Sequence, residues 1–536
     1  MKSKIFNIIF FIASASIIVG CKDESSYGPD PYAGGKEAYG IRFEDTTPSP
    51  SQGKAGTAMT FRVSGLSQYK DEVEFLINNA AAQITSITDS TITAVLPENV
   101  STGGTSLVVK GQIFPGPMCY VIGKVAIDPT FRSGAGANGI IRTIKKLTNN
   151  NYFIGGSFTN YDGFAASTTI NGIARITAGG EFVRGMNFRK SVEGGSVNSI
   201  HELSDGNLLI SGSFVKYDTT SLVSNITKIN TLGELQTEKV EILNLTSDPN
   251  KSSLTVPVFN GGTLSGITKT FVHNNKVTAI GGFGYFVDRY YERSTYNGIL
   301  TEIFQMNSIV RMHMTGGLDS TFNIDHTSLP KKSKGGLVGI VEDGYMQNDG
   351  KLIVVGRFNR YNNASVAGNI IRLNEDGSVD QSFKTGSGAD NSISSIVRSE
   401  STGKYIITGT FKTFNGVAAS GLAVLNEDGT LDNTFSNKGF SGGYPNFCYP
   451  MSNGLIIVSG SFTKYNNINR EGFLVLNADG SLAKDFNNTG KLYGTIYNAI
   501  EGINNLGQRS VTLVGYITSF NGQSNIGNIM RLTFQD

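Results

Sequence analysis

An eight-residue phrase recurs along the chain and constrains the fold more than any other feature of the sequence. Each copy follows a short apolar run such as NYFIGG or KLIVVG and precedes a second run such as NIIRL or GFLVL. The clear copies are GSFTNYDG from Gly156, GSFVKYDT from Gly212, GRFNRYNN from Gly356, GTFKTFNG from Gly409 and GSFTKYNN from Gly460. With weaker copies marked by Gly282 and Gly515, successive glycines lie 51 to 74 residues apart. Such a period indicates an array of supersecondary units.

Each unit is expected to be a small antiparallel sheet. Between copies stand turns such as NEDGSVDQSF and NEDGTLDNTF. Asp-Gly between alternating strands favours a tight hairpin in which both central residues have positive φ. One such sheet cannot bury both faces, but several packed around an axis can. Residues 118–536 shared among seven copies give about 60 residues each, the size of a propeller blade. The sequence therefore predicts an all-β protein with a seven-bladed β-propeller over residues 118–536.

The ends of the array indicate a closed ring rather than an open solenoid. The element Asp-x-[Ser/Thr]-Phe occurs at Asp319–Phe322, Asp380–Phe383 and Asp432–Phe435. It also occurs at Asp128–Phe131, before the first copy, whereas the last copy ends in NIMRLTFQD without one. We therefore expect the start of the array to supply the missing strand of the last blade. The units resemble delta-60 repeats, a class found in bacterial surface proteins; copies four to six fit best.

The repeated eight-residue phrase is expected to have a structural role rather than a catalytic or ligand-binding one. Its glycine permits a sharp exit from the strand. Its aromatic residues keep a constant register, which favours packing between neighbouring sheets; they are Phe158, Phe214, Phe358, Phe411 and Phe462, followed three residues later by Tyr161, Tyr217, Tyr361, Phe414 and Tyr465, with Phe520 in the last copy. The N-x-D-G-x-x-D turns faintly suggest calcium loops, but a hairpin turn is favoured because the terminal bidentate glutamate is absent.

The N-terminus predicts an exported lipoprotein. Two lysines precede an apolar run over residues 5–19, which has the length of a signal-peptide core and ends in Ile-Val-Gly-Cys at Cys21. This ending resembles a bacterial lipobox, which implies a signal peptide over residues 1–20 and lipidation of Cys21. Lys22, Asp23 and Glu24 resemble the signal that sends Bacteroidetes lipoproteins to the outer face of the outer membrane.

Two further segments separate the lipid anchor from the array. Residues 21–40 are rich in Gly, Ser, Pro and Tyr and are expected to form a flexible tether. Residues 41–117 contain short alternating runs such as TAMTFRVSGL and ITSITDSTITAVLP, with a glycine pair before the closing strand. This order resembles an IPT/TIG immunoglobulin-like domain, a class that usually serves as a spacer or interaction module.

Composition removes several classes of function. Without residues 1–20 the chain has 43 basic and 43 acidic residues, so it lacks the basic excess of a nucleic-acid-binding protein. Cys119 and Cys448 have no metal-ligand spacing and read as two separate buried thiols in preference to one disulfide. The four histidines form no HExxH or paired motif, and no Gly-x-Ser-x-Gly or Walker sequence occurs. We therefore predict no metal, no cofactor and no catalytic residues.

One insertion departs from the repeat and is the candidate contact site. The spacing grows between the second and fourth copies, where GYFVDRYYERSTYNGILTEIF begins at Gly284. Aromatic residues outside the repeat register are not required for packing, and exposed Tyr and Arg favour partner contacts. We expect ligand or partner contacts at Tyr285, Phe286, Arg289, Tyr290, Tyr291, Arg293 and Tyr296, against the alternative of a blade with a decorated edge.

The whole architecture resembles accessory surface lipoproteins of Bacteroidetes SusC/SusD-type nutrient importers. That resemblance implies a non-enzymatic binding or scaffold subunit, anchored in the outer membrane and facing the medium. A TonB-dependent transporter would be its partner, with a peptide or an oligosaccharide as ligand. The chain has no tryptophan, the preferred platform for sugars, which favours a peptide or a protein partner over a glycan. The alternative is a surface hydrolase with carboxylates at the propeller axis.

Overall fold

The computed structural model describes residues 39–166, 169–328, 332–366 and 368–535. The predicted signal peptide, Cys21 and the segment Lys22–Glu24 lie outside the described residues. Within the described part of the chain, no helix is long and apolar enough to cross a membrane. Four single 3-10 turns occur there: η1 (Ser67–Tyr69), η2 (Phe164–Ala166), η3 (Pro249–Lys251) and η4 (Tyr291–Arg293).

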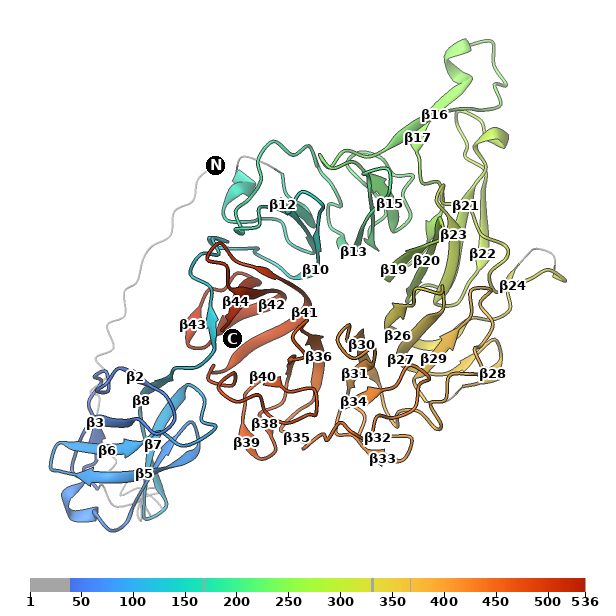
Figure 1. The fold of residues 1–536 in the computed structure, drawn as a ribbon. Coiled ribbons are helices and arrows are strands. Elements are labelled where there is room, and N and C mark those ends of the chain that lie inside the picture. Colours follow the sequence, from blue (N-terminus) through green and yellow to red (C-terminus); the bar gives the residue numbers. More distant parts are fainter. Residues whose placement is uncertain (1–38, 167–168, 329–331, 367, 536) are drawn as a thin grey trace, which may run out of the picture.

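An N-terminal domain of β-strands precedes the repeats (Figure 1). Its strands pair in the order β1-β3-β6-β5-β4-β7-β8-β2, antiparallel except for β2 with β8. Alternate residues of β3, including Met59, Phe61 and Val63, point into one core. β8 continues to Val121, past the expected boundary at residue 117. The strands are β1 (Arg42–Phe43), β2 (Gln52–Gly53), β3 (Ala58–Ser64), β4 (Val73–Ile77), β5 (Ala80–Ile87), β6 (Thr91–Val95), β7 (Gly103–Val109) and β8 (Gln112–Val121).

The repeats form antiparallel meander sheets arranged around a central opening (Figure 1), which confirms the all-β β-propeller. Each sheet runs outward in chain order, from its innermost strand. The sheets are β10 (Ile141–Lys146), β11 (Tyr152–Gly156) and β12 (Ile173–Ile176); β13 (Ser196–Glu202), β14 (Leu208–Ser213) and β15 (Ile226–Ile229); β19 (Ile267–His273), β20 (Lys276–Gly281) and β23 (Ile309–His313); β26 (Leu337–Met346), β27 (Leu352–Tyr361) and β29 (Ile370–Leu373); β30 (Ile393–Arg398), β31 (Tyr405–Gly409) and β34 (Leu422–Leu425); β36 (Pro445–Pro450), β37 (Ile456–Gly460) and β40 (Phe473–Leu476); and β41 (Leu492–Ile503), β42 (Arg509–Phe520) and β44 (Ile529–Phe534).

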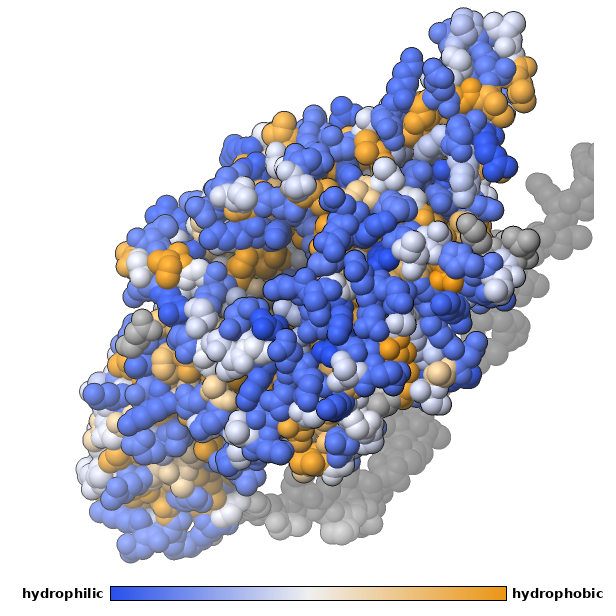
Figure 2. All heavy atoms as spheres, turned by 45° about the vertical axis from the view of Figure 1, so that its right-hand side comes forward, coloured by the Kyte–Doolittle hydropathy of each residue, from blue (hydrophilic) through white to orange (hydrophobic). Residues whose placement is uncertain are grey.

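Short strands decorate the rim. The hairpin of β16 and β17 projects from the ring, and Figure 2 shows apolar residues on this projection. The remaining strands are β16 (Thr237–Glu241), β17 (Ser253–Pro257), β18 (Gly262–Thr263), β21 (Tyr285–Arg289), β22 (Thr301–Gln305), β24 (Ile324–Asp325), β25 (Lys332–Ser333), β28 (Ala364–Ser365), β32 (Thr413–Phe414), β33 (Val417–Ala418), β35 (Phe440–Ser441), β38 (Lys464–Tyr465), β39 (Ile468–Asn469) and β43 (Gln523–Ser524).

The glycine that marks each copy is required by a close approach of two strands. Gly356 pairs with Val341 beside a β-bulge in β26, and a Cβ on Gly356 would overlap the carbonyl oxygen of Ile340. Its φ is not positive, so at this position the close approach of the neighbouring strand, rather than a left-handed backbone, requires glycine. The predicted exit from the strand is seen in other copies, where β11, β31 and β37 end at the marker glycine. In the third copy the residue at the bulge is Gly281, because it pairs with Ile267; the sequence assignment to Gly282 is wrong by one residue.

The repeated aromatic residues are buried, as predicted, at the seams between sheets. The tyrosines gain a second role from their hydroxyls. Tyr161, Tyr217, Tyr361 and Tyr465 each donate a hydrogen bond of 2.5 to 2.7 Å to the carbonyl of a turn glycine in the same copy. A buried hydroxyl needs such a partner, so each tyrosine fixes the turn at the outer end of its own sheet.

The Asp-Gly turns are hairpins, but not of the predicted geometry. In the fourth copy only Gly377 of the Asp376-Gly377 pair has positive φ. Asn374 accepts a hydrogen bond from Gly377 and donates one to Ser378, so the loop is a turn closed by a left-handed glycine. The Asp376 carboxylate accepts the Ser378 amide proton. The hairpin interpretation is therefore confirmed over the calcium loop, while positive φ at both central residues is wrong.

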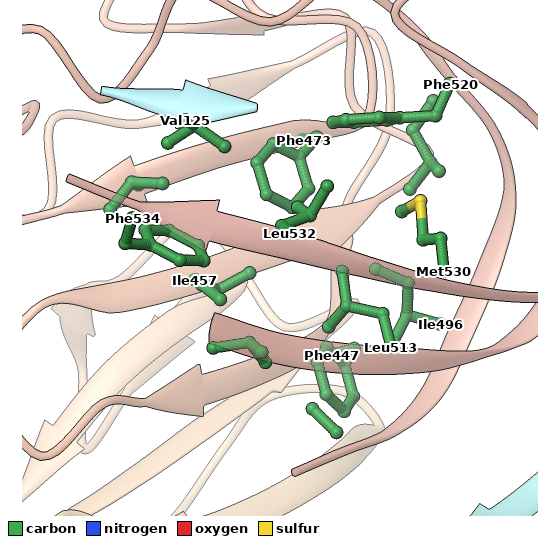
Figure 3. Packing of buried hydrophobic residues seen from close by; sticks show 14 of the residues in the cluster. Val125, Phe447, Ile457, Phe473, Ile496, Leu513, Phe520, Met530, Leu532 and Phe534 are labelled. Carbon is green, nitrogen blue, oxygen red and sulfur yellow. The ribbon is translucent and has the colours of Figure 1, made fainter. Parts of the chain in front are cut away.

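The ring closes between the two ends of the array, as the sequence predicts. β9 (Val125–Ile127) pairs antiparallel with β44 at the edge of the last sheet. Figure 3 shows Val125 of β9 in the same apolar cluster as Phe534 and Phe473. Beside this pair, Arg531 Nε donates to Asp128 Oδ2 at 2.6 Å, and both residues are buried. The first residues of the array thus complete the last blade.

The same arginine contact recurs at other seams. Arg311 and Arg372 donate through Nε to Asp319 and Asp380, both at 2.7 Å. Each guanidinium lies over the phenylalanine of its Asp-x-[Ser/Thr]-Phe element and also donates to a carbonyl in the turn of the next sheet. Burial alone would raise the pKa of Asp319, but hydrogen bonds from Thr321 and the charge of Arg311 lower it to about 2. The motif therefore joins neighbouring blades.

The N-terminal domain is hydrogen-bonded to the last two sheets. Arg470 is buried and donates to the Asn99 carbonyl at 2.9 Å, and burial lowers its pKa to about 10. Asn469 donates to the side chain of Asn78 at 2.8 Å. The Thr102 amide donates to the carbonyl of Asn488 at 2.9 Å. These contacts fix the domain on one side of the ring.

Candidate functional site

The innermost strands enclose a central channel. In ring order β10, β13, β19, β26, β30, β36 and β41 contact one another, and β41 contacts β10. The cavity between them has a volume of about 770 Å³ and takes residues from every one of these strands. This volume falls within the range of about 300 to 1,000 Å³ for small-molecule sites.

A ring of bulged residues faces this channel. Each innermost strand has one residue that is skipped in the pairing with the second strand, at the same place in every sheet. A bulged residue is left unpaired and its side chain is redirected, which is why bulges are frequent beside functional sites. All of these residues line the channel: Arg142, Asn198, Thr268, Glu342, Ser394, Asn446 and Tyr497.

The bulged residues include one cation, Arg142, and one anion, Glu342. Arg142 lies over the ring of Tyr497, with its guanidinium carbon 5.1 Å from the ring centre. Burial raises the pKa of Glu342, with Arg357 opposing the effect and Asp343 adding to it. Within the described chain neither Arg142 nor Glu342 has a salt-bridge partner. Both charges are therefore available to a ligand.

A second pair of charges in the channel is already used by the fold. Lys269 Nζ donates to Asp343 Oδ1 at 2.7 Å and to the Gly344 carbonyl at 2.9 Å. The other carboxylate oxygen of Asp343 accepts the backbone amide proton of Ile396 at 3.0 Å. Asp343 thus ties together three neighbouring innermost strands, and its charge is neutralised in place.

His201 is the channel histidine, and it is held neutral. Its Nε2 lies 2.8 Å from the Thr270 carbonyl oxygen, so the neutral ring carries its proton on Nε2. Burial lowers the pKa of His201 to about 4; the bond to Thr270 opposes this, while Lys145 and Lys269 lower the pKa further. Among the described residues no group of three or more His, Cys, Asp or Glu side chains could hold a metal ion.

Replacing His201 with glutamine should flatten the pH dependence of stability below neutrality. Above the ordinary histidine pKa near 6.5 the ring is neutral in both states. As pH falls from there to about 4, the unfolded chain binds a proton that the folded chain does not, so folding is weakened. Urea unfolding across this range should show a smaller loss for His201→Gln than for the wild type. Equal slopes would contradict a buried neutral histidine.

A side pocket of about 190 Å³ adjoins the channel at the start of three innermost strands. Ser394 and Asn446 line both cavities, and Tyr444 lines the pocket. The side-chain oxygen of Asn446 is buried and has no hydrogen-bond partner within the described residues. Tyr444 is exposed, as is Tyr516, which pairs with the pocket residue Thr495. The pocket therefore combines the exposed ring of Tyr444 with a polar group that lacks a partner among the described residues.

The candidate residues of the insertion do not form one exposed surface. Phe286 is buried in the core of the third sheet, and Tyr291, on η4, is also buried. Arg289 is buried as well and donates to the Asn260 carbonyl and the Ser224 hydroxyl. The expectation that these three are exposed is wrong, because β21 and β22 pair and pack as part of the fold.

The other insertion residues remain accessible. Tyr285 and Tyr296 are 48% and 49% exposed, Arg293 is exposed, and Tyr290 is half-buried under the Arg293 guanidinium. A contact role for these four stays a prediction. The bulge residues of the channel were missed, although a signal exists. Apolar residues three apart, as in Ile141-Arg-Thr-Ile144 and Ile393-Ser-Ser-Ile396, break the strict alternation of a strand and mark the bulge.

Both predicted thiols are free and buried, Cys119 in the N-terminal domain and Cys448 at the channel wall. Burial raises the pKa of Cys119 to about 11 and raises that of Cys448 as well. A thiol with a raised pKa carries little thiolate at neutral pH and is a poor nucleophile. The interpretation as two separate thiols is confirmed.

Family models match two parts of the chain. Residues 347–383, 400–435 and 452–482 match a domain of unknown function (DUF5122) described as a beta-propeller. These segments lie in copies four to six. Residues 17–117 match a second domain of unknown function (DUF5008). No curated protein matches the chain.

Solved structures resemble the chain distantly. The WD40 beta propeller domain of Doa1 is 11% identical, with 77% of this chain and 98% of that chain covered and a TM-score of 0.38. An auxiliary nutrient binding protein from Bacteroides thetaiotaomicron VPI-5482 is 10% identical, with 92% and 97% covered and a TM-score of 0.30. Another from Bacteroides ovatus ATCC 8483 is 9% identical, with 92% and 90% covered and a TM-score of 0.24. Similarities this low do not assign a function.

Proposed function

We propose that this chain is a non-enzymatic binding subunit that holds its ligand in the central channel and works beside a SusC/SusD-type nutrient importer. One observation carries the binding role. The channel is enclosed by every innermost strand and presents Arg142, Glu342 and the Asn446 carboxamide oxygen without partners for their charge or hydrogen-bonding capacity. The Asn446 oxygen is buried without a partner, and the charges of Arg142 and Glu342 face the same channel, so one ligand there can bond to all three.

The address of the protein is part of the proposal. Cys21 carries the lipid anchor, Lys22 to Glu24 direct the chain to the cell surface, and residues 21–40 tether it to the outer membrane. The N-terminal domain is an IPT/TIG-like spacer, and each meander sheet is one of seven blades. The support for this comes from the lipobox and the spacing of the repeats. The transporter is the expected partner, and a peptide or an oligosaccharide is the expected ligand.

A hydrolase acting at the axis is the second candidate, and one observation favours it. Glu342 has the raised pKa expected of a general acid. The second carboxylate of the channel, Asp343, is neutralised by Lys269 and by a backbone amide, so it is poorly placed to act as the base. Turnover of a peptide or polysaccharide that is abolished in Glu342→Gln would favour the hydrolase.

The binding role is tested by purifying the native lipoprotein from detergent-solubilised outer membranes. A TonB-dependent transporter should be retained with it, and protease added to intact cells should remove the protein from the surface. A Cys21→Ser variant should escape both assays, because it has no lipid anchor. Purification of the lipidated chain alone, or resistance to protease until cells are lysed, would contradict the proposal.

A further inference from the structure

We propose that the ligand of the channel is a short peptide with both ends free, whose carboxylate binds Arg142 and whose ammonium group binds Glu342. This inference rests on the proposed binding role of the channel and adds the chemical class of the ligand.

The two charges face each other across the channel. Arg142 is the bulged residue of β10 and Glu342 that of β26. Going round the ring, β13 and β19 separate these strands on one side, and β30, β36 and β41 on the other. Figure 1 shows β10 and β26 on different sides of the opening. One molecule lying across the channel can therefore meet both.

Arg142 and Glu342 each lack an oppositely charged partner among the described residues, and a charged group of the ligand could supply one. Arg142 contacts the face of Tyr497 but no carboxylate within the described residues. Stacking on an aromatic ring leaves the donors at the edge of a guanidinium free for a bidentate bond with a carboxylate. The Glu342 carboxylate lines the channel without a basic partner among the described residues, and partial burial raises its pKa, so a nearby opposite charge would stabilise its ionised form. An ammonium group would supply that charge.

The groups between the charges suit a peptide backbone. Thr268, Ser394 and Asn446 project from bulges of intervening strands and offer hydroxyl and carboxamide groups. Peptide units need both a donor and an acceptor at regular intervals. A neutral oligosaccharide has no charges to match Arg142 and Glu342, and Arg142 already stacks on one face of the channel residue Tyr497. The channel therefore favours a zwitterionic peptide.

The test is isothermal titration of the purified full chain with random-sequence libraries of di- to pentapeptides. Three libraries are compared: both ends free, the N-terminus acetylated, and the C-terminus amidated. Capping either end should weaken binding about tenfold or more, the effect of losing one charge-assisted hydrogen-bonded contact. Arg142→Met should bind free and amidated libraries equally, and Glu342→Gln should bind free and acetylated libraries equally. Capping one end of the peptide and replacing the residue that binds that end remove the same contact, so their effects on the binding free energy should not add.

Matched variants control for charge alone. Arg62 and Glu44 form an exposed pair at 3.8 Å in the N-terminal domain, so Arg62→Met and Glu44→Gln remove the same charges away from the channel and should bind like the wild type. Circular dichroism melting confirms that each variant is folded. Equal binding of capped and free libraries overturns the inference. Binding of neutral oligosaccharides in place of peptides also overturns it but leaves the proposed binding role standing, whereas no ligand and no retained transporter would overturn both.

Discussion

Replacing Arg531 with methionine should lower the free energy of unfolding by about 3 to 5 kcal/mol, because it leaves the buried Asp128 carboxylate without its partner. The guanidinium also donates to the Ala178 carbonyl at 2.7 Å and to the Thr130 hydroxyl at 3.1 Å, and it lies over the Phe131 ring. All of these contacts join the end of the array to its start. The measurement is chemical denaturation followed by circular dichroism.

The control separates the unpaired charge from the lost packing. If the cost comes from an uncompensated carboxylate, adding Asp128→Asn to Arg531→Met should restore part of the lost stability, although Asp128→Asn alone is destabilising. Arg62→Met, at an exposed ion pair, should cost less than about 1 kcal/mol. A double variant whose loss equals the sum of the two single losses would show that the residues act independently, contrary to the ring-closing role.

Replacing Phe411 with alanine should cost about 3 to 5 kcal/mol of stability, because it opens a cavity in a seam. The side chain is 0% exposed and packs in the cluster that joins β27 and β29 of one sheet to β30 and β31 of the next, with Val355, Ile370 and Ile393 among its members. The neighbouring side chains are closely packed on rigid sheets, so they cannot shift far enough to fill the cavity that the phenylalanine ring leaves.

Val417 provides the control for Phe411 in the same repeat copy. It lies on β33 and is 49% exposed, so Val417→Ala should change stability by no more than about 0.5 kcal/mol. Both variants should bind the peptide library like the wild type at temperatures where they are folded, because neither residue lines the channel. A small loss for Phe411→Ala would mean that its ring is not a seam contact.

The repeat made much of the fold predictable. Residues that recur in register, such as Phe411 and Tyr361, face the same environment in every copy, so their packing role could be predicted without a structure. Ring closure could be predicted from one displaced element, Asp128 to Phe131. The last copy lacks this element and the first copy is preceded by one, so pairing the two ends of the array completes the last sheet.

The candidate site could not be predicted in the same way, because function here resides in positions that vary. Arg142, Glu342 and Tyr497 occupy the same bulge in three copies yet share no chemistry, so a search for repeated residues passes over them. The reverse holds for Phe286 and Tyr291. Both lack repeat register and are nevertheless buried: Phe286 because β21 and β22 pack in the core of the third sheet, and Tyr291 on η4, which contacts β16.

The pairing of β9 with β44 also determines when the propeller can close during synthesis and folding of the chain. Asp128 and Arg531 are 403 residues apart, so the segment that leaves the ribosome early can pair only after the residues of β44 have been synthesised. Until then β9 is an unpaired edge, and closing so long a loop carries a large entropic cost. The channel, and any ligand it holds, can exist only after that final step, so a chain cut short by a few dozen residues would lack a complete channel rather than have a weaker one.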